Sequence, residues 1–171
     1  MATQRIGLIE AIPEAQDVTY QNHKAKCNVT EARIVARMVN IISSLCRQNG
    51  LPNDWNHRLG IIVPFRNQIA LIRKEMNSLS IEGYEEINID TVERYQGSQR
   101  DIIIFSTTVV TPYELSILSA PVRMDDCLID RKLNVAITRA RKQFFMVGNP
   151  SLLRESDAYR TFLSNIPWWK P

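Results

Sequence analysis

Apolar and polar positions along the chain alternate between strand-like and helix-like patterns. Residues 59–64 read Leu-Gly-Ile-Ile-Val-Pro, a continuous apolar run typical of a strand that is covered on both faces. An amphipathic helix is predicted on either side of this run, each with apolar residues three or four positions apart. The first stripe is Ile34, Val35, Met38, Ile42 and Leu45, and the second is Ile69, Ile72, Met76 and Leu79.

Asn28 and Glu31 indicate where the first of these helices begins. They stand three residues apart in Asn-Val-Thr-Glu, which resembles a capping box with the asparagine as the cap. We expect the preceding residues 1–27 to form an irregular lead-in that contains a short apolar run at 5–9.

The second half of the chain continues the alternation. Residues 87–92 and 101–110 are predicted strands. The segment from Thr91 to Arg100 is barely long enough for a parallel crossover, so we expect one helical turn there and leave an antiparallel pair open. Residues 111–130 read as an irregular excursion. A helix at 131–141, a strand at 143–147 and a last short helix capped by Asp157 complete the pattern.

Strands that alternate with helices imply a single α/β domain built on a mostly parallel sheet. We expect this domain to fill residues 1–171, as a fragment of a longer chain. Composition agrees with a globular domain, since 44% of the residues are hydrophobic and 23% are charged. The net charge of +3 permits a polyanionic partner without requiring one.

Several classes of function are disfavoured by the composition. The 3 cysteines form no C-x-x-C and the chain has only 2 histidines, so neither a zinc site nor a disulfide framework is expected. A reducing compartment, the cytoplasm or the nucleus, is the predicted location. The longest uncharged stretch, residues 102–113, is too short and too polar to span a membrane. The chain has no G-x-x-x-x-G-K-[ST] and therefore no phosphate loop of its own.

The richest candidate for chemistry is residues 131–142, where 5 of 12 residues are basic. If the segment is helical to Arg141, then Arg139 and Arg141 leave the helix about 160° apart, on opposite flanks of the apolar stripe. A guanidinium held rigidly in this way suits phosphate recognition. The simpler alternative is a solvated basic face.

Two polar segments could also bind a ligand. Residues 91–101 follow a strand, at the place where open α/β sheets bind ligands, although polar loops with one glycine are common. Arg66, Asn67 and Gln68 stand at a helix N-terminus, which suits an anion but equally suits ordinary capping.

The order and spacing of these segments are more specific than any one of them. Together they resemble motifs IV, V and VI of superfamily 1 helicases, in the branch of the nonsense-mediated-decay RNA helicase and the Okazaki-fragment nuclease-helicase. The resemblance covers about residues 28–165, and the strongest part is Leu-Asn-Val-Ala-Ile-Thr-Arg-Ala-Arg. The matching segments are residues 28–32, 59–68, 91–97, 131–141 and 147–150.

This resemblance implies a RecA-like, three-layer α/β/α fold of the P-loop NTPase type without the phosphate loop itself, the second of the two motor domains. Arg139 matches the arginine finger, which stabilises charge on the transferring phosphoryl group. Gln96, Gly97, Gln99 and Arg141 are implied ATP contacts, with Gln99 standing where the family usually has Glu. Pro64, Arg66, Asn67, Thr91 and Asn134 are the implied nucleic-acid contacts.

The resemblance also implies partners. These are single-stranded DNA or RNA, ATP with Mg²⁺, and a first RecA-like domain of the same chain that carries the Mg²⁺ ligands. Alone, the fragment should hydrolyse essentially no ATP. The implied function is ATP-driven translocation along a strand by a helicase. A catalytically silent RecA-like module that binds nucleic acid or a protein is the alternative, and the retained Arg139 argues against it.

Overall fold

The computed structural model describes residues 5–12, 26–52, 54–95, 98–124 and 127–169. Their centre is a six-stranded sheet with the order β3-β2-β4-β7-β1-β8, in which every pairing is parallel. The predicted mostly parallel sheet is therefore confirmed. Its strands are β1 (Ile6–Glu10), β2 (Leu59–Val63), β3 (Asn88–Thr91), β4 (Arg100–Ser106), β7 (Ala140–Gly148) and β8 (Trp168–Trp169).

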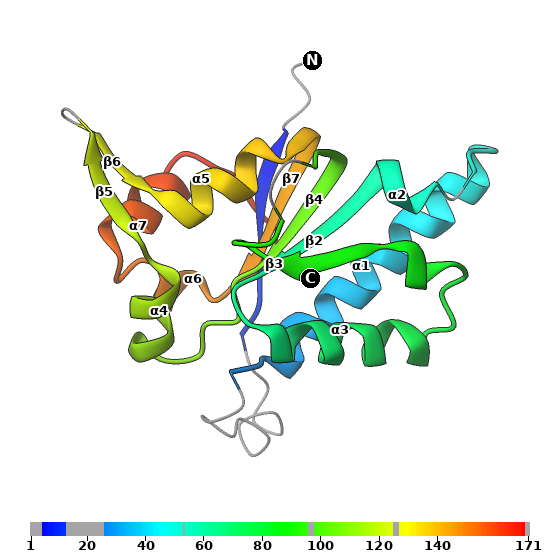
Figure 1. Ribbon diagram of the computed structural model, residues 1–171, viewed down its shortest axis with the longest axis horizontal. Coiled ribbons are helices and arrows are strands. Elements are labelled where there is room, and N and C mark those ends of the chain that lie inside the picture. The colour runs from blue at the N-terminus through cyan, green and yellow to red at the C-terminus, as the bar shows by residue number, and fades with distance from the viewer. Residues whose placement is uncertain (1–4, 13–25, 53, 96–97, 125–126, 170–171) are drawn as a thin grey trace.

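Helices cover both faces of the sheet, which gives three layers (Figure 1). On one face lie α1 (Val29–Gln48) and α3 (Arg66–Ser78), which pack on each other. The short helix α2 (Trp55–Arg58) leads into β2, and a 3-10 turn at Tyr84–Glu86 leads toward β3. The opposite side holds α4 (Pro112–Leu118), α5 (Arg131–Thr138), α6 (Pro150–Leu153) and α7 (Asp157–Leu163).

The central strands are apolar on both sides because each side meets a separate core. Ile61 and Ile104, which are paired across β2 and β4, belong to the core under α1 and α3. Their neighbours Ile62 and Ile103 point the other way, into the core under α5 and α7. The continuous apolar run at residues 59–64 was therefore a correct sign of a doubly covered strand.

The crossover from β3 to β4 passes over β2, which lies between them and is parallel to both. Its start makes a single helical turn, in which the Tyr95 amide donates to the Thr91 carbonyl at 2.8 Å. The predicted turn is confirmed, and the antiparallel alternative is excluded.

Two other expectations were wrong. The lead-in is not irregular throughout, because Ile6–Glu10 forms β1 and pairs with β7. Residues 111–130 are not an irregular excursion either. They form α4 and an antiparallel hairpin of β5 (Pro121–Met124) and β6 (Cys127–Asp130). A capping box between Thr111 and Glu114, with proline in the first turn, begins α4.

Candidate functional site

Four of the predicted nucleic-acid contacts meet at the carboxyl end of the sheet, where β2 and β3 finish. Val63 pairs with Thr91 in the last register position of these strands. Pro64, Arg66 and Asn67 follow β2 directly, so they stand beside Thr91. A pocket of about 420 Å³ is lined by Lys26, Pro64, Phe65, Arg66, Asn67, Thr91, Glu93 and Arg94.

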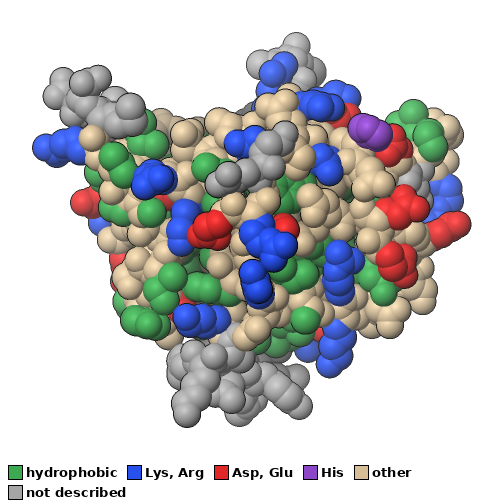
Figure 2. Space-filling view, in the orientation of Figure 1, with side chains coloured by type: hydrophobic (Ala, Val, Ile, Leu, Met, Phe, Trp, Pro, Cys, Tyr) green, Lys and Arg blue, Asp and Glu red, His purple; other side chains and the backbone are tan. Residues whose placement is uncertain are grey.

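Three of the four charged side chains that line this pocket are basic. The Lys26 ammonium lies 5.5 Å from the centre of the Phe65 ring, and the Arg66 side chain is exposed. The Arg94 guanidinium lies 3.7 Å from the partly buried Asp90 carboxylate, and the Arg94 side chain itself is exposed. Figure 2 shows several Lys and Arg side chains close to a few acidic ones near the middle of the face of the molecule that it draws. A pocket with exposed cations fits a phosphate backbone.

Asn134 lies apart from the other predicted nucleic-acid contacts. Its side chain is exposed in α5, two residues after Lys132. The Lys132 ammonium lies 3.5 Å from the Glu93 carboxylate, so the first turn of α5 borders the carboxyl end of the sheet. Asn134 itself does not line the pocket described above.

A buried polar network fixes the chain beneath the pocket. The fully buried Gln68 amide accepts from the Asn28 backbone N–H at 2.8 Å and donates to the Asn28 carbonyl at 3.0 Å. The same amide donates to the Ser106 hydroxyl at 3.2 Å. The start of α1, the first turn of α3 and the end of β4 are therefore held together by hydrogen bonds that water cannot replace.

Glu31 completes this network from inside the core. It accepts hydrogen bonds from the Ser106 hydroxyl at 2.7 Å and from the Thr108 N–H at 2.8 Å. The Thr107 hydroxyl donates to it at 3.1 Å. Burial is the largest influence on this carboxyl group and raises its pKa from 4.5 to about 7, although the hydrogen bonds act in the opposite direction.

The capping prediction at Asn28 is confirmed, but the reciprocal half of the capping box is not. The Asn28 side chain accepts from the Glu31 backbone N–H at 3.0 Å, as predicted. The Glu31 side chain does not return to the Asn28 backbone, whose N–H donates to Gln68 instead. Glu31 turns inward because the end of β4 offers it two hydroxyl groups and a backbone donor.

Arg139 and Gln99 lie at the amino end of the sheet, opposite the pocket. The Arg100 N–H donates to the Arg139 carbonyl at 2.9 Å, where β4 and β7 begin. The Gln99 amide donates to the carbonyl of Thr138 at 3.1 Å. These bonds fix the backbone that carries Arg139, the residue after α5.

The guanidinium of Arg139 is not neutralised in the part of the chain that the structure describes. No ion pair involves it there, and its buried Nε has no hydrogen-bond partner among the described residues. The buried Nε of Arg100 is in the same condition. Buried N–H groups without partners are uncommon, so each of these two Nε groups is a donor whose hydrogen bond is unmade among the described residues.

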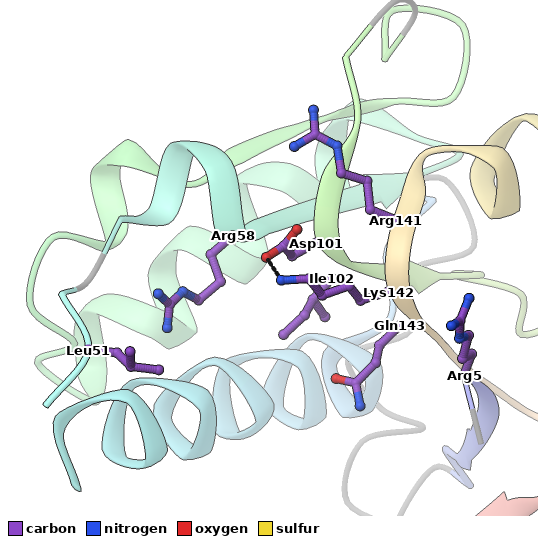
Figure 3. Close-up of a pocket in the computed structure, with 8 residues that line it drawn as sticks. All are labelled: Arg5, Leu51, Arg58, Asp101, Ile102, Arg141, Lys142 and Gln143. Atoms are coloured by element: carbon purple, nitrogen blue, oxygen red, sulfur yellow. Dashed lines mark hydrogen bonds and ion pairs between the residues drawn. The ribbon is translucent and has the colours of Figure 1, made fainter. Parts of the chain in front are cut away.

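The expected helical placement of Arg141 was wrong. The helix ends at Thr138, and from Ala140 onward the backbone pairs with β4 as strand β7. Arg141 is therefore an exposed strand residue rather than the second flank of a helix. It lines a pocket of about 640 Å³ beside Arg58 and Asp101. In Figure 3 its guanidinium extends away from both of them.

One segment joins the two ends of the sheet. It leaves the carboxyl end at Thr91 and reaches the amino end at Gln99. Tyr95, between them, is buried, and its hydroxyl group lies directly over Gly60 in β2, where a side chain would overlap it. Burial raises the pKa of the Tyr95 phenol. The predicted contacts at positions 96 and 97, Gln96 and Gly97, lie outside the described residues.

Sequence reasoning missed the roles of Glu31, Gln68, Tyr95 and Arg100. Glu31 was visible as an acid in the first turn of α1, but a carboxylate there normally serves capping. Among the described residues, no group of three or more His, Cys, Asp or Glu side chains could hold a metal ion. None of the described helices has the length and apolar character needed to cross a membrane.

Known proteins resemble this chain. A family model described as an AAA domain matches residues 5–151. Regulator of nonsense transcripts 1 from Dictyostelium discoideum is 30% identical over 143 residues, which is 81% of this chain and 10% of that protein. DNA replication ATP-dependent helicase/nuclease DNA2 from Xenopus laevis is 32% identical over 141 residues, again 81% of this chain and 12% of that protein.

A third relative, mov-10-B.1 from Danio rerio, is 38% identical over 112 residues, which is 62% of this chain and 11% of that protein. The chain thus spans about a tenth of the length of the curated relatives that it matches.

Proposed function

The chain belongs to the AAA domain family and is a motor domain of the superfamily 1 helicase type, and we propose that the two ends of its sheet bind different ligands. Arg139, at the amino end, acts as the arginine finger for ATP hydrolysis. Gln99 and Arg141, with Gln96 and Gly97, contribute nucleotide contacts. The contacts to single-stranded DNA or RNA are Pro64, Arg66, Asn67, Thr91 and Asn134.

The unneutralised guanidinium of Arg139 is the observation that carries this proposal. Its backbone is fixed on both sides, through the Arg139 N–H to Ala136 at 3.2 Å and the Arg139 carbonyl to Arg100 at 2.9 Å. Its charge has no carboxylate partner among the described residues. A preorganised cation stabilises charge that develops in a transition state without first breaking an ion pair.

The carboxyl end supports the nucleic-acid half of the proposal. Thr91 is largely buried and fixed, because its N–H donates to Asp90 at 2.8 Å and its carbonyl accepts from Tyr95 at 2.8 Å. The exposed Arg66 begins α3, whose first N–H groups also favour a phosphate. Such contacts bind any sequence, which suits a protein that moves along a strand.

ATP with Mg²⁺ is the substrate in this proposal. Arginine and glutamine donors at the amino end fit phosphate and hydroxyl groups, and we expect the Mg²⁺ ligands to come from a first RecA-like domain of the same protein. The action of the chain's own residues is electrostatic: Arg139 meets the phosphoryl group when the two domains close. The segment from Thr91 to Gln99 then couples this closure to the strand contacts.

The cytoplasm or the nucleus is the proposed location. Relatives named for nonsense transcripts and for DNA replication support these two compartments.

The proposal is tested by ATP turnover of the full helicase that contains this chain. Arg139→Ala should lower kcat by about 10³-fold or more, because an arginine finger contributes on the order of 10³–10⁵. Arg139→Lys should restore little, since an ammonium lacks the planar fork. Oligonucleotide affinity should stay within about threefold, which corresponds to less than 1 kcal/mol.

Arg123→Ala is the matched control, because Arg123 is an exposed arginine on the β5–β6 hairpin. It should leave ATP turnover unchanged. Turnover within about tenfold of wild type in Arg139→Ala would remove the finger from the mechanism and favour a module that only binds.

A further inference from the structure

An apolar groove runs along α1, and the proposed motor function leaves it unused. Its volume is about 460 Å³, and its walls are the second half of α1 and the loop toward α2. Three of its side chains are unusually accessible: Ile41 is 58% exposed, Leu45 is 52% exposed and Leu51 is 50% exposed. One exposed apolar side chain is ordinary, but three in one groove mark a binding surface.

The floor of the groove is sheet rather than loop. Ile102 from β4 and Phe145 from β7 lie there, both only partly buried against the core. Strands β4 and β7 and the long helix α1 form most of the groove, and Asn49 and Leu51 come from the loop toward α2. Such a surface is preformed for a partner.

A basic pocket adjoins the apolar groove and shares Leu51, Arg58, Ile102 and Gln143 with it. Its basic side chains are Arg5, Arg58, Arg141 and Lys142, and Asp101 is its acid. Asp101 is occupied by Lys142 at 2.6 Å, as Figure 3 shows. Arg5 and Arg58 form no ion pair with the described carboxylates. The Arg58 guanidinium donates to the Cys46 Sγ in the groove wall and, after the hydrogen bond from His57, is among the groups that lower the pKa of Asp54. The surface therefore presents apolar contacts next to basic side chains.

We propose that this groove binds an acidic amphipathic helix of a partner protein. The apolar stripe of that helix would lie on Ile41, Leu45 and Leu51, and its acidic flank would face Arg5 and Arg58. The apolar lining of α1 extends from Met38 to Cys46, which corresponds to about 12 Å or two helical turns. Helix-in-groove recognition uses anchors spaced in this way.

Charge argues against the other occupants. A second copy related by two-fold symmetry would place the same basic surface against itself, which costs energy. Single-stranded nucleic acid would satisfy the cations, but its backbone would leave Ile41 and Leu45 in water. An acidic amphipathic helix satisfies both parts of the surface at once.

The test measures binding of a synthetic peptide to the 171-residue chain by fluorescence anisotropy. The peptide has about 18 residues, enough for a helix, with leucines spaced i, i+3, i+4, i+7 and glutamates elsewhere. We expect binding that weakens by about tenfold in the Ile41→Ser/Leu45→Ser double variant, because two anchors are lost. Arg58→Glu should also weaken it by about tenfold, and this part of the affinity should fall as salt is raised.

Matched controls distinguish peptide binding in the groove from nonspecific binding elsewhere on the surface. Leu79→Ser removes an apolar side chain that is 41% exposed at the end of α3, and Arg123→Glu reverses an exposed arginine on the hairpin. Both should bind the peptide within about twofold of wild type. A scrambled peptide of the same composition, and a peptide with lysine in place of glutamate, should bind at least about tenfold more weakly.

Three results would overturn the proposal. The first is no saturable binding of the acidic peptide, or equal binding of the lysine peptide. The second is displacement of the peptide by an oligonucleotide together with loss of oligonucleotide affinity in the Ile41→Ser/Leu45→Ser variant, which would make the groove a nucleic-acid surface. The third is dimerisation of the chain that the same variant abolishes, which would assign the groove to a second copy.

Discussion

The two ends of the sheet differ in how their polar groups are satisfied. At the carboxyl end, Gln68, Ser106 and Glu31 bond to one another and to the backbone beneath the pocket. At the amino end, the backbone around Arg139 is fixed but its buried Nε has no partner among the described residues. The polar groups beneath the pocket are therefore satisfied within the protein, whereas at the amino end a buried donor lacks a partner beside the residue that we propose contacts ATP.

Among the substitutions at Glu31, Gly60 and Gln99, removing the charge from Glu31 should change the free energy of unfolding most. Its pKa is raised from 4.5 to about 7 in the folded chain, so between these values the unfolded chain releases a proton that the folded chain keeps. This contribution is complete below about pH 4.5 and is lost as the pH rises through about 7. The loss amounts to about 3 kcal/mol, since each pKa unit is worth 1.36 kcal/mol.

Glu31→Gln imitates the protonated form, so its stability relative to wild type should increase by about 3 kcal/mol between pH 4.5 and pH 8. Urea unfolding at the two pH values measures this difference. Glu86→Gln, at an exposed position, serves as the control and should show no such change. The same pH dependence in wild type and Glu31→Gln would show that Glu31 does not titrate within the network.

Closing the space over Gly60 should have the next largest effect, because it disturbs the segment that joins the two ends. A methyl group there would overlap the Tyr95 hydroxyl oxygen and lie 2.8 Å from Cζ of the ring. We expect Gly60→Ala to lower the free energy of unfolding by about 2 kcal/mol. Adding Tyr95→Phe, which removes the overlapping oxygen, should recover part of this loss.

Gly50→Ala is a matched control for the added methyl group. Gly50 has φ +64° with no atom within 4 Å of an added Cβ, so its cost of about 1 kcal/mol comes from the backbone alone. Failure of Tyr95→Phe to restore any stability in Gly60→Ala would show that the overlap is not the cause.

Gln99→Glu should have the smallest effect on stability, and it tests the hydrogen bond between Gln99 and Thr138 at the amino end. Its amide donates to the Thr138 carbonyl at 3.1 Å, and a carboxylate would place an acceptor against an acceptor. We expect a loss of about 1 kcal/mol in urea unfolding, with Gln99→Ala losing less because it removes only the bond. A change in the nucleotide affinity of the full-length protein would support the proposed contact between this position and the nucleotide.

Much of the fold could be predicted because local and tertiary preferences agree. The doubly buried run at residues 59–64 and the cap at Asn28 needed no knowledge of distant partners. The end of α5 could not be predicted this way. Ala140 continues the helical apolar stripe, yet it begins β7 because its backbone pairs with Arg100, 40 positions earlier. A small residue such as alanine fits both a helix and a strand, so the pairing with β4 determines that Ala140 is in a strand.

The candidate site was predictable in part, for a similar reason. Thr91 ends β3, and Arg66 and Asn67 follow the adjacent strand β2, so their grouping follows from a parallel sheet. Glu31 bonds to residues 106–108, and no local pattern reveals such a partner. The helix α4 was a different kind of miss, because Thr-Pro-Tyr-Glu carries a visible capping box and a proline at the first position.

The salt dependence of oligonucleotide binding by the full-length protein tests the proposed division between the two ends most directly. Loss of one phosphate contact lowers the slope of log K against log salt by about 0.7 for a single strand. We predict this decrease for Arg66→Gln at the carboxyl end and an unchanged slope for Arg139→Gln at the amino end. An equal decrease in both variants, or a decrease only in Arg139→Gln, would contradict the division.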